Sequence, residues 1–146
     1  MGRVTTTVEL PYPVDLVFRV ATRIPDLPRW LPEVAGAELL DPALEPGARV
    51  RLRLGPAAAN AELTGVVHEL AAPERLVIAG TGGPLSVSVR TELVADGPFR
   101  TRATLEVTLD TPPFLGFIAK EAERRIGEEL PVSMARFRAL LDEEPS

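Results

Sequence analysis

The chain has 146 residues, of which 45% are hydrophobic and 25% charged, and its formal net charge is −5. These values are typical of a soluble globular protein, so we expect residues 1–146 to form a single domain. The acidic balance argues against a nucleic-acid-binding protein, and no apolar run approaches the roughly 20 residues of a membrane-spanning helix. The absence of cysteine excludes disulfides and thiolate metal sites. We expect a cytoplasmic protein.

The N-terminal third predicts one strand and two short helical segments. Residues 3–10 alternate between apolar and polar side chains, which indicates a half-buried strand. Pro11 and Pro13 end it, and residues 14–22 then place Val14, Val17 and Phe18 on one side of a short helix. Residues 24–32 contain three prolines, which allow one helical turn at most.

The middle of the chain predicts a series of strands joined by short connections. Alternation is clearest at 48–54, where Val50, Leu52 and Leu54 alternate with three arginines. Short connections between such runs favour antiparallel neighbours with one dry face. The glycine-rich residues 80–83 predict a hairpin turn, because they lack the Lys-Ser/Thr of a phosphate-binding loop. The expected strands cover residues 38–41, 48–54, 61–70, 75–79, 85–93 and 102–109.

Residues 113–143 predict one long amphipathic helix. Apolar residues recur at steps of three or four and form one stripe with no charged side chain on it. A helix of this length needs another element to cover the stripe. Pro131 lies four residues after Gly127, so we expect a kink there within one helix. The stripe comprises Leu115, Ile118, Ala122, Ile126, Leu130, Met134, Phe137 and Leu141.

The element order therefore predicts an α+β fold. One dry sheet face and one helical stripe fit each other, and a twisted sheet of this width should curl around the helix. We expect a curled antiparallel sheet of about six to seven strands around a long C-terminal helix, with two short helices after the first strand.

Three stretches of the chain resemble the START-like, helix-grip (SRPBCC) superfamily, and within it the polyketide cyclase/dehydrase and lipid-transport family. They are residues 10–18, residues 24–34 with the sequence Trp30-Leu31-Pro32-Glu33-Val34, and the amphipathic helix after Pro112-Pro113. The resemblance implies a deep apolar pocket between sheet and helix. Together with the dry strand faces, it implies a pocket lined by Trp30, Leu31, Val50, Leu52, Val87, Val89, Leu105, Val107, Ile118, Ala122, Ile126 and Met134.

Few polar residues are candidates for catalysis or metal binding. His68 is the only histidine, so a two-histidine metal site is impossible, and we expect no metal and no cofactor. His68 and Glu69 are the weak catalytic candidates; Arg90 and Tyr12 are further polar residues that could face the pocket. Ring cyclases of the superfamily place a tyrosine and an arginine in their pocket. The tyrosine position falls on Val34 here and the arginine position falls on or beside Glu69, so neither residue matches, which argues against ring-cyclase chemistry.

These observations favour binding or transport of a hydrophobic small molecule that is lipid-, quinone- or polyketide-like. One alternative is a polyketide cyclase or dehydratase, which would need His68 or Glu69 to point into the pocket. Another is a protein-interaction module, which would expose an apolar patch around Trp30 and Leu31. The sequence leaves open whether the protein is an enzyme, and we favour a non-catalytic role.

Overall fold

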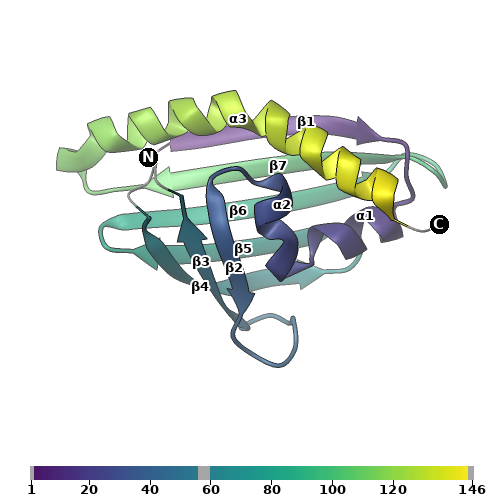
Figure 1. The fold of residues 1–146 in the computed structure, drawn as a ribbon, viewed down its shortest axis with the longest axis horizontal. Helices are drawn as coiled ribbons and strands as arrows, with labels where there is room; N and C mark the ends of the chain where they lie inside the picture. Colours follow the sequence, from purple (N-terminus) through teal and green to yellow (C-terminus); the bar gives the residue numbers. More distant parts are fainter. Residues whose placement is uncertain (1, 56–59, 145–146) are drawn as a thin grey trace.

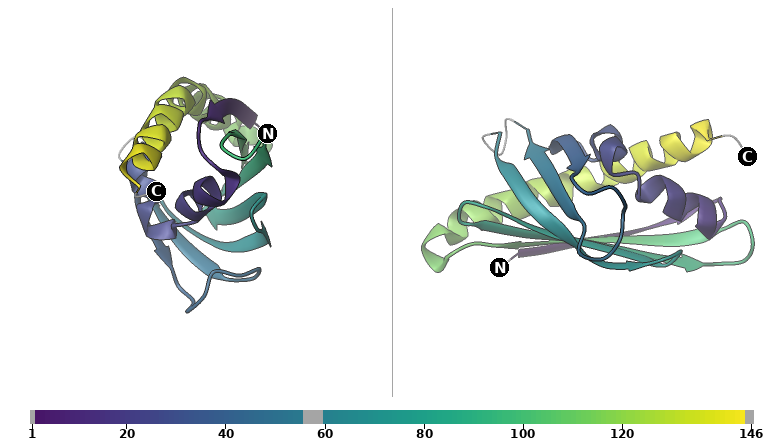
Figure 2. Two further views of the ribbon diagram at one scale, coloured as in Figure 1. Left: turned by 90° about the vertical axis from the view of Figure 1, so that its right-hand side faces the viewer. Right: turned by 90° about the horizontal axis from the view of Figure 1, so that it is seen from below.

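A computed structural model describes residues 2–55 and 60–144, which form one seven-stranded antiparallel sheet with helices on its concave side (Figures 1 and 2). The strand order is β1-β7-β6-β5-β4-β3-β2. The predicted α+β class and curled sheet are therefore confirmed. The elements are β1 (Gly2–Leu10), α1 (Val14–Ala21), η1 (Ile24–Asp26), α2 (Leu27–Trp30), β2 (Val34–Leu39), β3 (Arg49–Leu54), β4 (Glu62–Ala71), β5 (Arg75–Gly82), β6 (Leu85–Ala95), β7 (Thr101–Asp110), η3 (Pro113–Leu115) and α3 (Gly116–Glu143).

The alternating residues of the strands divide between the two faces of the sheet as predicted. Along β7, Ala103, Leu105, Val107 and Leu109 are buried, while the residues between them are more accessible. The strand register places apolar residues opposite one another: Val107 of β7 lies opposite Val4 of β1 and opposite Val89 of β6. Apolar side chains therefore gather on the concave face, where they can be covered by the helices.

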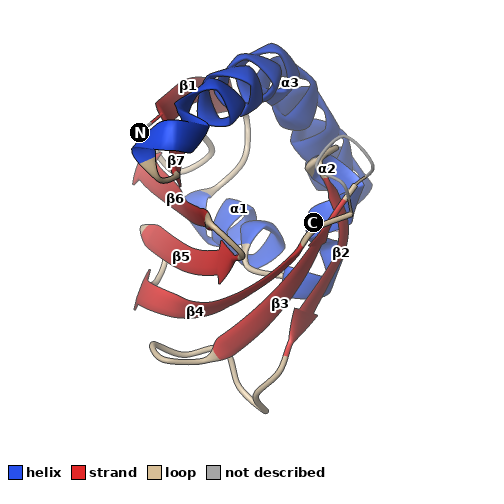
Figure 3. Cartoon of the chain, turned by 90° about the vertical axis from the view of Figure 1, so that its left-hand side faces the viewer, coloured by secondary structure: helices blue, strands red, loops and turns tan. Residues whose placement is uncertain are grey.

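Glycines allow β4 and β5 to approach closely where the sheet curls. Gly65 of β4 lies opposite Gly80 of β5, and a Cβ on Gly65 would overlap the Ala79 carbonyl oxygen. A Cβ on Gly82 would come within 2.5 Å of the Leu63 side chain. Side chains at these positions would force the strands apart. Figure 3 shows the result: the sheet bends round from β1 to β2, and α3 closes the ring between them.

Two predicted boundaries were wrong. The residues from Gly80 to Gly82 belong to β5, and the turn itself begins at Gly83, whose φ of +58° suits glycine. β2 begins at Val34 and not at residue 38, because Val34 pairs with Leu54 of β3. The small residues at the start of β2 show no alternation of polarity, so the sequence pattern could not reveal this part of the strand.

The short helices lie where the sequence places them and cover one end of the concave face. α1 buries Val17, Val20 and Ala21, and it is followed by the two consecutive turns η1 and α2. Pro25 and Pro28 occupy the first turns of η1 and α2, where the missing N–H costs no helical hydrogen bond. These turns bring Trp30 under the long helix.

α3 is one helix that continues through Pro131, and its axis bends around the middle in Figure 1. Its second half is part of the core: Leu130, Met134, Phe137, Leu140 and Leu141 are all buried. The Phe137 ring meets the Trp30 ring edge-on, with the ring centroids 4.7 Å apart.

The C-terminal end of α3 is also tied to the short helical segments by polar contacts. The Tyr12 hydroxyl donates to Asp142, and Arg23 forms a bidentate pair with Glu144. Arg29 donates to Glu143 over 3.2 Å. The second half of α3 is thus anchored on several sides, which fixes the position of the whole helix over the sheet.

Gly65→Ala should destabilise the fold, because the added methyl group would overlap the backbone of β5. We expect a loss of about 2 kcal/mol in the free energy of unfolding, measured by urea denaturation. Gly116→Ala is the matched control: its Cβ would meet nothing within 4 Å, and alanine favours the helix. Equal stability of the two variants would show that β4 and β5 do not need the close approach.

Candidate functional site

The main cavity lies between the concave face of the sheet and the first half of α3. Its volume is about 580 Å³, within the range of pockets that hold drug-sized molecules. The sheet side is apolar. The strand residues that line the cavity are Val34, Leu52, Leu54, Leu63, Leu85, Val87, Val89, Val107 and Leu109. From α3 come Phe117, Ile118, Ala119, Glu121, Ala122, Arg125, Ile126, Glu129, Leu130 and Ser133.

Most of the twelve predicted pocket residues lie at this cavity. Eight line it: Leu31, Leu52, Val87, Val89, Val107, Ile118, Ala122 and Ile126. Three others, Trp30, Leu105 and Met134, line a separate small cavity deeper in the molecule. Val50 lines neither of the two and is fully buried in the core. The cavity is thus shifted toward the N-terminal half of α3 compared with the prediction.

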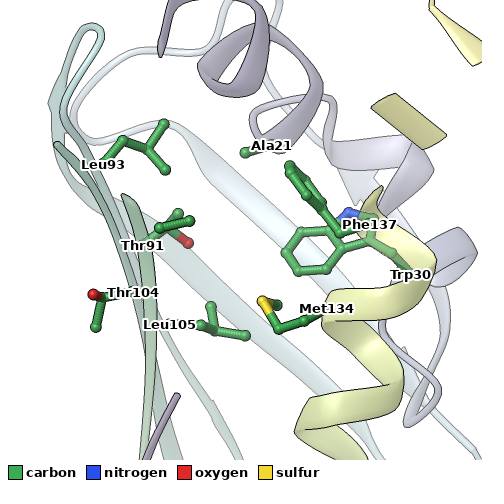
Figure 4. Close-up of a pocket in the computed structure, with 9 residues that line it drawn as sticks. Ala21, Trp30, Thr91, Leu93, Thr104, Leu105, Met134 and Phe137 are labelled. Carbon is green, nitrogen blue, oxygen red and sulfur yellow. The ribbon is translucent and has the colours of Figure 1, made fainter. Parts of the chain in front are cut away.

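The small cavity is a minor gap in a part of the core that is otherwise filled by side chains. Its volume is about 20 Å³, enough for roughly one water molecule, and Figure 4 shows Trp30, Met134 and Phe137 on one side and Leu105 on the other. Trp30 is only 3% exposed, and its Nε1 is buried with no hydrogen-bond partner in the described part of the chain. Trp30 therefore anchors its loop in the core, and the apolar patch expected around it is not formed by the described residues.

The opening of the main cavity lies near the start of α3. Phe117 and Ile118 line the cavity and yet are 71% and 47% exposed, so they form its rim. Phe114, in the preceding turn η3, is 76% exposed. In contrast, Ala119, Leu130 and Ser133 line the cavity and are buried, so they lie at its inner wall.

The helix side of the cavity is not free of charge, which corrects the prediction of an uncharged stripe. Glu129 and Arg125 of α3 both line the cavity, and Glu33, just before β2, joins them. The Glu33 backbone is fixed, because its carbonyl oxygen accepts a hydrogen bond from Gly55 N over 3.0 Å. Position 129 is three residues after Ile126 and four before Ser133, and this spacing was the signal that could have located it.

Glu129 has unusual electrostatics for a helix glutamate. Burial, followed by the neighbouring Glu33 carboxyl, raises the pKa of Glu129 from 4.5 to about 7, although Arg125 and Arg136 act in the opposite direction. Its Oε2 atom is buried and has no hydrogen-bond partner among the described residues. A carboxyl group with these properties is poised to gain or lose a proton near neutral pH.

The polar residues singled out from the sequence lie elsewhere. Glu69 pairs with Arg75 on the outer face of the sheet, and Arg90 donates to Glu92 over 2.6 Å on the same face. His68 is exposed at the bulge where the register of β4 against β5 shifts. Tyr12 contacts Asp142 at the far end of α3. In this geometry His68 and Glu69 do not reach the cavity, so the condition set for them as catalytic groups is not met.

Within residues 2–55 and 60–144, no group of three or more His, Asp or Glu side chains is arranged to hold a metal ion. Over the same residues, no helix combines the length and apolar character required to span a membrane. The main cavity, with the carboxyl groups that line it, is the candidate functional site.

The combination of a curled antiparallel sheet, two short helical segments after β1 and a long C-terminal helix over an apolar cavity defines the helix-grip class. A sequence model of the polyketide cyclase/dehydrase and lipid transport family matches residues 1–142. The chain belongs to this family. The resemblance noted from the sequence is thereby confirmed.

Solved structures show the same fold at low sequence identity. A START superfamily protein from Mycobacterium smegmatis has a TM-score of 0.79 at 18% identity, covering 98% of this chain and 99% of that one. The Zhui aromatase/cyclase from Streptomyces sp. R1128 has a TM-score of 0.78 at 16% identity, with 96% and 93% covered. The protein TTHA0849 from Thermus thermophilus has a TM-score of 0.76 at 19% identity, with 99% and 100% covered. No curated protein sequence matches the chain.

Glu129→Gln should change the pH dependence of stability. Since the pKa of Glu129 is raised in the folded state, the folded protein keeps a proton between about pH 4.5 and pH 7 that the unfolded chain releases. The free energy of unfolding of the wild type, relative to the variant, should therefore fall as the pH rises through this window and level off above it. Urea denaturation at a series of pH values measures the difference.

Glu128→Gln is the control for this experiment, because Glu128 is exposed and pairs with Arg124 on the outer side of the same helix turn. The free energy of unfolding of Glu128→Gln should change with pH as that of the wild type does between about pH 4.5 and pH 7. Parallel curves for the wild type and Glu129→Gln would show that Glu129 ionises normally.

Proposed function

We propose that the protein binds and carries a hydrophobic small molecule, lipid-, quinone- or polyketide-like, in the main cavity. The observation that carries this proposal is the cavity itself: about 580 Å³ of space between sheet and helix, with strand walls of leucine and valine. Empty apolar space of this size is costly in a folded protein, because the side chains around it lose packing contacts. A bound apolar molecule restores those contacts.

The position of the rim supports the same function. Phe117 and Ile118 join the apolar lining to the molecular surface at the start of α3, so an apolar molecule meets a continuous apolar path into the cavity. The family description, which names both lipid transport and polyketide cyclisation, is consistent with a ligand of this kind.

A second function, cyclisation or dehydration of a polyketide-like substrate, is favoured by one observation, the Glu129 carboxyl group at the cavity wall with its buried, unpartnered Oε2 atom, where burial also raises its pKa. A glutamate with such a pKa, at a cavity wall, can serve as general base and then as general acid. His68 and Glu69 are not available for this role. Incubation with a long-chain β-hydroxy ketone tests it, since loss of water yields a conjugated enone that absorbs in the ultraviolet. Turnover that is lost in Glu129→Gln would support catalysis.

Filling the cavity should abolish ligand binding. Ala122 lines the cavity on α3, and Ala122→Phe places a ring in the space. We expect the affinity for the fluorescent apolar probe N-phenyl-1-naphthylamine to fall about tenfold or more, which corresponds to about 1.4 kcal/mol. Fluorescence titration measures it, and native mass spectrometry of the gently purified wild type identifies any molecule that copurifies.

Ala135→Phe is the matched control, because Ala135 lies on the exposed side of the same helix. It should bind the probe like the wild type. Absence of both a copurifying ligand and probe binding by the wild type, or equal binding by Ala122→Phe, would overturn the proposed function.

A further inference from the structure

Among the described residues, the polar groups that line the main cavity lie on its helix side, and two of the carboxyl groups there come from different parts of the chain. Glu129 projects from the middle of α3, and Glu33 comes from the segment between α2 and β2. Ser133, one helical turn after Glu129, is buried and lines the cavity beside it. The strand walls offer only apolar side chains, so a ligand can form polar interactions mainly along this side.

One carboxylate oxygen in this region lacks a partner. Glu129 Oε2 is buried and accepts no hydrogen bond within the described part of the protein. A buried acceptor without a partner destabilises the folded state, and a donor supplied by a ligand would recover part of that cost. When the Glu33 and Glu129 carboxyl groups hold one proton between them, that proton is used within the pair, and Glu129 Oε2 is left as an acceptor for a ligand donor.

The charges around the region disfavour an anionic ligand. Three carboxyl groups line the cavity on the helix side, those of Glu33, Glu121 and Glu129, against one cation, Arg125. Arg125 already pairs with Glu121 at 3.5 Å. Arg136 acts on Glu129 only as a more distant positive charge. A ligand carboxylate would thus meet like charges in a cavity of low polarity, where repulsion is strong.

We infer that the cavity selects an apolar molecule bearing a neutral hydroxyl group, held by the Glu33–Glu129 carboxyl pair, and discriminates against carboxylates such as fatty acids. The hydroxyl donates to Glu129 Oε2, the acceptor without a partner, while the apolar remainder of the ligand fills the apolar part of the cavity. This inference rests on the proposed function and adds the chemical class of the ligand.

Two probes of equal chain length test the inference: 1-decanol and decanoate, each displacing N-phenyl-1-naphthylamine at pH 7.5. We expect 1-decanol to bind about tenfold tighter than decanoate. Glu129→Gln, which removes the charge and keeps the shape, should raise the affinity for decanoate severalfold. Glu33→Gln should act in the same direction, because it removes the charge of the other member of the pair. The outward-facing variant Glu128→Gln should leave both affinities unchanged.

Glu129→Leu separates the hydroxyl contact from the charge effect. It should weaken 1-decanol binding about fivefold while leaving the apolar probe bound at least as tightly as in the wild type. Raising the pH from 6 to 8 should weaken decanoate binding in the wild type, because the pair then carries more negative charge, and this dependence should shrink in Glu129→Gln.

The outcomes distinguish this inference from the proposed function. If the apolar probe binds and Ala122→Phe blocks it, but decanoate binds as tightly as 1-decanol and the Glu33 and Glu129 variants change neither, the inference is wrong and the carrier function stands. If the wild type binds no apolar probe at all, both fail.

Discussion

The structure depends on how the apolar stripe of α3 is covered, because the helix is longer than the part of the core that can pack against it. Its second half meets Trp30 and the rest of the core, and Phe137 at its centre is buried. Its first half packs beside β1, where Gly127 lies near Val4, but its other side faces the main cavity. The same hydrophobic stripe thus builds the core at one end and the wall of a cavity at the other.

The curl of the sheet determines how much space is left. A flatter sheet would lie against the helix along its whole length, and side chains would fill the interface. The close approach of β4 and β5 at Gly65 and Gly80 lets the sheet bend round the helix instead. One edge of the sheet contacts α3 directly through β1, and the other edge, β2, is linked to α3 through α2. The cavity follows from this closed arrangement and not from any single lining residue.

Much of the fold could be predicted from the sequence, because alternation and helical spacing are direct consequences of which face is buried. The arginine-alternating strand β3 and the apolar positions of β7 are examples. The prediction failed where side chains carry no polarity signal. The start of β2 contains Ala35, Gly36 and Ala37, and the end of β5 contains two glycines; only pairing with neighbouring strands makes them part of the sheet.

The candidate site was predictable in its apolar part and not in its polar part. A valine or leucine on a dry strand face lies either in the core or at a pocket wall, whereas a glutamate on a helix is ordinarily solvated. Glu129 is drawn inward because Ile126 and Ser133 share its side of the helix, and Glu33 meets it only after the chain has turned through η1 and α2. The two are nearly a hundred residues apart in sequence, so no local pattern reports their proximity.

The unequal anchoring of α3 also bears on how a bound molecule leaves. The contacts to Trp30, Tyr12, Arg23 and Arg29 all hold the second half, whereas the first half packs beside β1 and lines the cavity. Opening of one part of a structure costs less free energy than global unfolding. On the proposed function, we therefore expect the exchange of a ligand to depend on the local stability of the first half of α3 and not on the overall stability of the protein.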